Sequence, residues 1–331
     1  MRPDDDELAV AMRALDPART PELSALTPAQ LALRDRITAT RVRPPHRRPA
    51  LWMAAGLPAA AVLVVALVVV FTFTPSHRAF AQSPPPLRFA PLAQTTEEVL
   101  HMARTALQDK PGPATAQRRS VSLGWFANAT DDGDPAQRVV ICPELTTFEW
   151  DADQSGRVTI VAAEPYWADD PSASVPADAA PAPGTVLSDT TYAPGTFGAL
   201  TVEPPPATRE GLPSWLTLMG LPAVHDAADL VDAMYTAFNY WDLTDEQHAA
   251  LLELLLTRDD VAVAGSTKDR AGRDVIGIST DSDRYPGVRK IVLISSDSGR
   301  IIGMETIRIT AGENRPAGSV LDYTLWDPPL P

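Results

Sequence analysis

The sequence predicts an α+β protein with an N-terminal cytoplasmic tail, one transmembrane helix, and an external curved antiparallel β-sheet. This sheet is expected to be a half-barrel with two or three helices on its concave face. Three observations predict this class: a long apolar run without charge, two groups of short alternating strand patterns, and helical patterns before and between them. Strands joined by short turns pair antiparallel, so a parallel βαβ sheet is not expected.

The apolar run sets the domain organisation. Residues 51–73 read LWMAAGLPAAAVLVVALVVVFTF and carry no charge, and a helix needs about 20 apolar residues to cross a bilayer core of about 30 Å. Six arginines lie between residues 34 and 48, whereas the first cation after the run is Arg78. The positive-inside rule then places residues 1–50 in the cytoplasm and makes the chain a single-pass protein of the cell membrane. Cleavage as a signal peptide near Ala79 and Ala81 is the alternative.

A proline-rich segment follows the predicted span. Residues 74–95 contain five prolines, which is typical of a semi-rigid stalk that holds a domain away from the membrane. The remainder, residues 96–331, is predicted to be the extracytoplasmic α+β domain. Its size is ample for a packed hydrophobic core.

Three segments of this domain have helical signals. Thr95 and Glu98 form a capping-box pattern before a helix over residues 96–109. An apolar stripe predicts a second helix over residues 226–240. Thr244 caps a third, which ends near residue 255. Because few residues separate the last two helices, we expect them to form a helical hairpin.

Strand patterns lie on both sides of the last two helices. Residues 168–198, rich in Pro, Ala and Ser, suggest a long insertion that contains a short strand at 185–187. Asp297-Ser298-Gly299 is typical of a hairpin turn with a left-handed glycine. The other predicted strands are residues 117–127, 138–141, 146–151, 157–163, 198–202, 260–264, 274–280, 290–295, 300–310 and 320–326.

Charge and motifs argue against several classes of function. Residues 81–331 hold 18 basic and 35 acidic side chains, which excludes nucleic-acid binding through bulk charge. The sequence has no Gly-x-Ser-x-Gly, His-Glu-x-x-His, Walker A or Gly-x-Gly-x-x-Gly pattern. We therefore predict no enzymatic activity, no cofactor and no metal. His248 is expected to be exposed to solvent, and Cys142, the only cysteine, is expected to be buried and inert.

Aromatic residues supply the candidate ligand site. Core packing explains most of them, and the alternative is a concave aromatic surface that accepts an acyl chain or a peptide. The four side chains from Phe238 to Trp241 cannot all point inward from one helix. The candidate ligand-binding residues are Trp125, Trp150, Trp215, Phe238, Tyr240 and Trp241.

Three features together resemble a known group of proteins. The first is a tail with Leu-rich pieces before an Arg-rich flank and one span, and the other two are runs in the external domain. Those runs are residues 244–255 with Asp259-Asp260-Val261, and residues 269–273 with Ile291-Val292-Leu293-Ile294 and residues 297–303. In this order they are similar to actinobacterial single-pass membrane proteins associated with extracytoplasmic-function sigma factors.

The resemblance implies a fold and a function. The external domain of such proteins is similar to the periplasmic lipoprotein-carrier and RseB sensor folds, in which a curved antiparallel sheet cups helices over an apolar cavity. We expect a non-enzymatic membrane-anchored sensor or accessory protein whose external domain binds a lipid, a peptide or an envelope component. Residues 1–50 would signal to a cytoplasmic regulator, with a sigma factor as the candidate partner. The alternative is a membrane-tethered lipid or lipoprotein carrier, or a chaperone.

Overall fold

The computed structural model describes residues 83–127, 138–312 and 315–329. The predicted tail, the predicted span over residues 51–73 and the start of the predicted stalk lie outside the described residues. Within these three ranges, the structure contains no helix that combines the length and the apolar character needed to cross a membrane.

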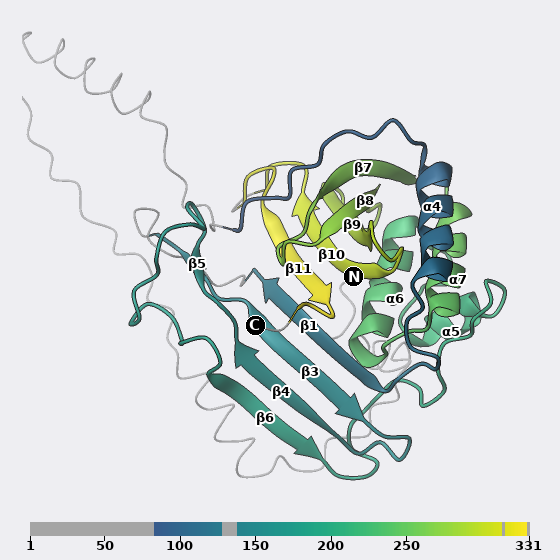
Figure 1. The fold of residues 1–331 in the computed structure, drawn as a ribbon, viewed down its shortest axis with the longest axis horizontal. Coiled ribbons are helices and arrows are strands. Elements are labelled where there is room, and N and C mark those ends of the chain that lie inside the picture. The colour runs from purple at the N-terminus through teal and green to yellow at the C-terminus, as the bar shows by residue number, and fades with distance from the viewer. Residues whose placement is uncertain (1–82, 128–137, 313–314, 330–331) are drawn as a thin grey trace, which may run out of the picture. The chain divides into compact units, whose positions relative to one another are not determined.

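Nine strands form one antiparallel sheet in the order β6-β4-β3-β1-β11-β10-β9-β8-β7 (Figure 1). Strands β1, β3, β4 and β6 form a first meander and β7 to β11 a second, and the pairing of β11 with β1 joins them. Strands β2 and β5 pair in a separate ribbon. The bounds are β1 Arg119–Phe126, β2 Val140–Ile141, β3 Glu144–Trp150, β4 Gly156–Ala162, β5 Tyr166–Trp167, β6 Val186–Tyr192, β7 Val261–Lys268, β8 Asp274–Asp281, β9 Val288–Ser295, β10 Ile301–Arg308 and β11 Val320–Trp326.

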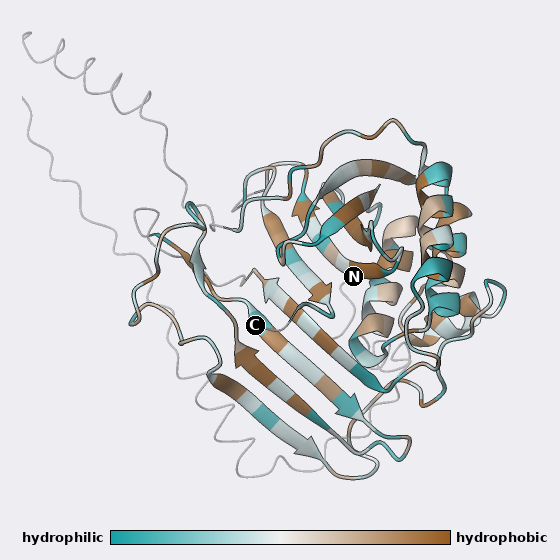
Figure 2. Cartoon of the chain, in the orientation of Figure 1, coloured by the Kyte–Doolittle hydropathy of each residue, from teal (hydrophilic) through white to brown (hydrophobic). Residues whose placement is uncertain are grey.

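Successive side chains along each strand point to opposite faces of the sheet. On one face, which we call the helix face, Trp150 and Trp326 belong to the larger hydrophobic core together with the helices. On the opposite face, the back face, Tyr323 and Leu325 belong to a smaller core that Phe89 covers. Figure 2 shows this alternation as apolar and polar bands along the strands.

Four helices of the described chain pack on the helix face: α4 (Thr96–Asp109), α5 (Leu212–Leu218), α6 (Ala227–Tyr240) and α7 (Asp245–Leu256). Capping boxes begin three of them, with Thr95 before α4, Asp226 before α6 and Thr244 before α7. Helix α6 lies against β1, β8 and β9, while α7 packs against α4.

The three predicted helices are confirmed, but their number and pairing are corrected. Helix α5 raises the count from the expected two or three to four. Pro213 starts this helix instead of breaking it, because a proline in the first turn removes an N–H that has no partner in the helix. The expected hairpin is wrong, since α7 packs mainly against α4. Trp241 and Thr244, both extended, redirect the chain between α6 and α7.

Most predicted strands are confirmed, with three differences. Strand β5 was not predicted. Strand β6 is longer than the predicted 185–187. Residues 198–202 form no strand, because the side-chain amide of Gln154 binds both backbone groups of Ala199. Its Nε2 donates to the Ala199 oxygen at 3.1 Å, and the Ala199 N–H donates to its Oε1 at 2.9 Å.

Residues 83–90, which we call the strap, fall within the predicted stalk and run along the sheet. The Val320 N–H donates to the Ser83 hydroxyl at 3.1 Å, and Ala90 exchanges two backbone hydrogen bonds with Ser266 at 2.8 and 2.9 Å. Gly277 makes room for the Phe89 ring, since a Cβ built there would lie 2.5 Å from it. The strap therefore covers the β7 edge and part of the back face.

Candidate functional site

A cavity of about 650 Å³ lies on the helix face, between the strands β1, β3, β4 and β11 and the helix α6. We call it the cleft. Tyr235 and Asn239 of α6 form one wall, and the segment from Val139 to Cys142 forms another. The strands supply the floor, which consists of Ser122, Gly124, Phe126, Glu144, Thr146, Phe148, Ile160 and Thr324.

Gly124 keeps the floor of the cleft low. A Cβ at this position would lie 3.3 Å from the Tyr323 carbonyl oxygen and 3.4 Å from Thr324 Oγ1. Phe126, two residues further along β1, is 59% exposed although it is large and apolar. The strand thus offers an open floor beside an exposed aromatic ring, which is an arrangement that suits an apolar ligand.

The cleft also contains polar groups without partners. Thr324 is 2% exposed, and its Oγ1 makes no hydrogen bond within the described part of the chain. A buried hydroxyl left in this state costs about 1–3 kcal/mol. The side chains of Ser122 and Asn239 make no hydrogen bond with described residues either. The cleft can therefore offer hydrogen bonds as well as apolar contact.

Cys142 and Glu144 lie together at one side of the cleft. Burial, and then the negative charge of Glu144, raise the pKa of the Cys142 thiol. A protonated thiol is a weak nucleophile, so this arrangement does not activate the cysteine. Cys142 is half-buried, where the sequence predicted full burial.

The predicted aromatic site residues are distributed between the cleft and the core. Trp125 borders the cleft, but its ring stacks on Tyr323 of the back face with centroids 6.4 Å apart. Trp150 packs edge-on against Trp241 at 5.1 Å, and its indole N–H donates to the Tyr240 oxygen at 2.8 Å.

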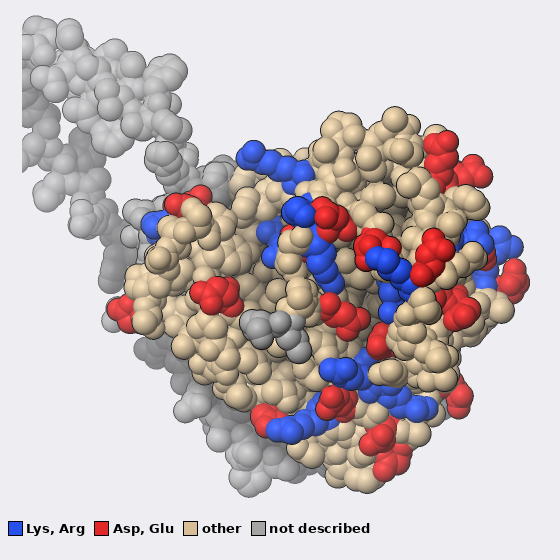
Figure 3. All heavy atoms as spheres, viewed as in Figure 1, with Lys and Arg blue, Asp and Glu red and all other residues tan. Residues whose placement is uncertain are grey.

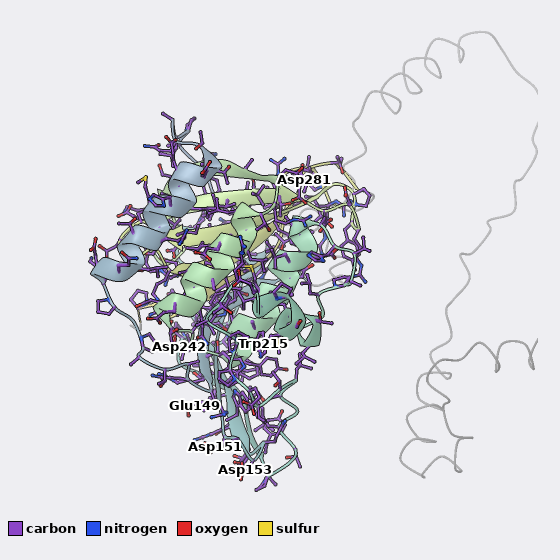
Figure 4. The ribbon with its side chains drawn as sticks, turned by 90° about the vertical axis from the view of Figure 1, so that its right-hand side faces the viewer. Glu149, Asp151, Asp153, Trp215, Asp242 and Asp281 are labelled. Carbon is purple, nitrogen blue, oxygen red and sulfur yellow. The ribbon has the colours of Figure 1, made fainter. Side chains whose placement is uncertain are left out.

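The remaining two candidates lie elsewhere in the core. The Phe238 ring contacts Trp326 at 4.7 Å, and the indole N–H of Trp215 donates to the Glu203 oxygen at 3.1 Å. Trp215 belongs to α5 and is labelled in Figure 4. The structure thus groups Trp150, Tyr240 and Trp241, while Trp125 alone of the six borders the cleft. Ligand binding by these aromatic residues stays a prediction.

A smaller cavity of about 200 Å³ lies where α6, α7 and the β9–β10 turn meet. Charged and polar side chains line it together with apolar ones, among them the predicted site residues Phe238 and Trp241. Arg300 reaches Asp242 at 3.6 Å and Asp245 at 3.5 Å. Burial, and then the charge of Asp327, raise the pKa of Asp242 to about 6. The expectation for His248 is wrong, because this side chain is 4% exposed and its Nδ1 accepts the Ile301 N–H at 3.2 Å.

The hydrogen bond from the Ile301 N–H to the His248 ring joins β10 to α7, and both residues are buried. Burial, followed by the nearby Arg300, lowers the pKa of His248 well below its usual value. The ring is therefore neutral and holds the strand backbone as an acceptor. His248 therefore makes a structural contact between α7 and β10.

Charged side chains elsewhere do not define a site. Glu149, Asp151 and Asp153 lie along the β3–β4 end of the sheet, and Asp153 is the furthest of them from Asp242 (Figure 4). Among the described residues, no three His, Cys, Asp or Glu side chains are placed to hold a metal ion. Figure 3 shows acidic and basic groups interspersed over one face of the molecule.

Among known proteins, the chain resembles solved structures only weakly. No protein-family model matches the chain. No curated protein matches it either. Similar solved structures include a domain provisionally assigned as an outer membrane lipoprotein-sorting protein from Vibrio parahaemolyticus. The identity is 9%, the match covers 70% of this chain and 91% of that chain, and the TM-score is 0.19. At this score the likeness carries no argument.

Proposed function

We propose that the chain is a membrane-anchored sensor whose external domain binds an amphipathic ligand, a lipid or a peptide, in the cleft. The observation that carries this proposal is the Thr324 hydroxyl, which is buried without a partner on the floor of a cavity of about 650 Å³. Ligand sites of about 300–1,000 Å³ typically combine apolar walls with a few polar groups. The cleft has this size and this mixture.

The lining favours a ligand with an apolar body and an uncharged polar end. Phe126, Phe148 and Ile160 provide apolar surface, while Ser122 and Asn239 provide hydrogen-bonding groups. Among the described residues that line the cleft, Glu144 is the one carboxylate and no Lys or Arg accompanies it. An anionic group would therefore gain no ion pair in the cleft.

Native mass spectrometry of the full-length protein in phospholipid nanodiscs tests the binding proposal. We expect a co-purifying lipid or peptide, and we expect Gly124→Val to lose it because the added side chain raises the cleft floor. Thr324→Val keeps the shape and should reduce occupancy about five-fold, the effect of one hydrogen bond. Thr190→Val, at an exposed position of β6, is the matched control. Equal occupancy in all three variants would contradict the proposal.

The proposed signalling by residues 1–50 is tested separately. Residues 1–50 would transmit the state of the external domain to a cytoplasmic regulator, with a sigma factor as the candidate. Replacing this segment with an unrelated sequence should abolish the transcriptional response to the ligand while leaving occupancy of the cleft unchanged. If every cellular function persists after the replacement, the tethered-carrier alternative is the better account.

A further inference from the structure

The back face of the sheet carries a cavity of about 570 Å³, on the opposite side of β1 and β11 from the cleft. We call it the back pocket. Leu123 and Tyr323 form its floor, and Pro85 of the strap forms one side. Residues 163–166 and 171–175, from the segment between β4 and β6, complete the wall. Most of this surface is apolar.

Two tyrosine hydroxyls in this pocket pair with each other, and one of their two hydrogens is left without an acceptor in the described part of the chain. Tyr166 and Tyr323 place their hydroxyl oxygens 3.4 Å apart, beyond the usual 2.5–3.0 Å or so of a good O–H···O bond. Whichever hydroxyl donates, the hydrogen of the other has no acceptor among the described residues. Tyr323 is 1% exposed and Tyr166 is half-buried, so when Tyr323 donates to Tyr166, the free hydrogen is that of Tyr166, which can reach solvent or a ligand. Burial raises the pKa of both tyrosines, and both therefore remain donors.

Arg270 adds a cationic donor at the same end of the pocket. Its guanidinium lies over the Tyr323 ring, 4.5 Å from the centroid. Nε and Nη2 donate to Glu305 Oε2 at 3.0 and 2.6 Å, and Nη2 also donates to the Pro85 oxygen at 2.9 Å. The guanidinium also donates a hydrogen bond to the Tyr166 hydroxyl oxygen, so one network joins Arg270 to Tyr166, Glu305 and Pro85.

The charges around the pocket select against an anion. Glu305 neutralises Arg270, and Glu164 adds a further carboxylate at the exposed rim. A ligand carboxylate would meet this net negative charge, whereas an uncharged carbonyl oxygen would use the donors without repulsion. A peptide supplies such a carbonyl next to an apolar side chain, which matches the hydrogen-bond donors of the pocket and its apolar lining of Leu123, Pro143 and Pro165.

We propose that the back pocket is a second ligand site and binds an uncharged peptide segment. A backbone carbonyl of the peptide accepts a hydrogen bond from the Tyr166 hydroxyl beside Arg270, and an apolar side chain lies against Leu123, Pro143 and Pro165. The site is separate from the cleft, so it stands whether or not the cleft binds a ligand. Because Arg270 also binds Pro85, the bound peptide touches the strap.

Isothermal titration of the full-length protein with the blocked tripeptide N-acetyl-Ala-Leu-Ala-amide tests this site. The peptide should bind the wild type, and the same peptide with a free C-terminal carboxylate should bind at least about five-fold more weakly. Tyr166→Phe should weaken the amide by about five-fold, the effect of one hydrogen bond, because it keeps the ring and removes a donor. Tyr285→Phe, at an exposed tyrosine outside the pocket, should have no effect.

Two further variants locate the binding. Ala173→Trp, on the loop that borders the pocket, should fill the pocket and abolish binding. Thr324→Val, on the cleft side of β11, should leave it unchanged. The proposal is overturned if the wild type does not bind the amide, if the carboxylate binds as tightly, if Tyr166→Phe or Ala173→Trp has no effect, or if Thr324→Val abolishes binding.

Discussion

The two halves of the sheet have different surroundings although both are antiparallel meanders. Strands β8 and β9 are covered on both sides, since Ile278 and Ile294 belong to the helix-face core while Val275 and Leu293 belong to the back-face core. Strand β6 is mostly exposed, and its Val186 is 58% exposed. The covered half is built for stability. The open half leaves space on both faces, and both candidate pockets lie at its border.

The largest expected effect concerns the covered half and the strap. Arg270→Gln removes one partner of a buried ion pair, in which the Glu305 side chain is 1% exposed, and should cost about 3–5 kcal/mol in the free energy of unfolding. The strap should loosen at the same time, because Arg270 binds Pro85 and Glu305 binds the Leu87 N–H. Urea denaturation of the full chain measures the first effect, and the rate of trypsin cleavage after Arg88 measures the second.

A matched control exists for this prediction. Arg289→Gln breaks an ion pair with Asp281 whose side chains are 40% and 53% exposed, so it should cost less than about 1 kcal/mol. If both variants unfold at the same urea concentration as the wild type, the Arg270–Glu305 pair does not hold the strap.

Two isoleucine truncations compare the halves directly. Ile294→Ala removes a side chain that is 1% exposed and should destabilise the protein by about 2–5 kcal/mol. Ile160→Ala, at a half-buried position that lines the cleft, should cost less than half as much, because part of its surface already faces solvent. Comparable losses in thermal unfolding would mean that the open half is as well packed as the covered half.

Local signals predicted most of the fold. The capping residues Thr95 and Thr244 and the hairpin turn at Gly299, whose φ is +74°, were readable because each acts within a few residues of chain. The sequence could not show that β11 returns to β1, because no local pattern specifies a pairing across about 200 residues of chain.

The candidate site was much less predictable. Aromatic residues were reasonable candidates, yet Trp150 and Trp241 serve the core, and the cleft depends on the small residues Gly124 and Thr324. Neither position stands out in a sequence. Their importance arises because β1 and β11 pair in the register that places Gly124 opposite Thr324. His248 was missed for a similar reason, since its partner is a backbone N–H 53 residues away.

A smaller effect should appear in the pH dependence of stability. Burial raises the pKa of Asp322 to about 6, against the attraction of Lys290 and the hydrogen bond from Thr306, and Asp232 and Glu305 raise it further. The folded state then binds this proton more tightly than the unfolded state, so the contribution of Asp322 to stability falls as the pH rises from about 4 to about 6. Asp322→Asn should stabilise the protein by about 1–2 kcal/mol at pH 7 and have no effect near pH 4. Denaturant midpoints of both proteins across this range test the sign, and a gain that persists at pH 4 would contradict it.

The smallest expected effect comes from a variant at the border of the two halves that should raise stability and weaken ligand binding. Thr324 is buried without a partner, so Thr324→Val replaces an unsatisfied hydroxyl by a methyl group of the same shape and should stabilise the empty protein by about 1 kcal/mol. The same variant should weaken binding in the cleft, because the hydroxyl is the donor that a ligand would use. Thr190→Val should change neither property. A Thr324→Val protein that is less stable than the wild type would show that the hydroxyl already has a partner, and the argument that it awaits a ligand would then fail.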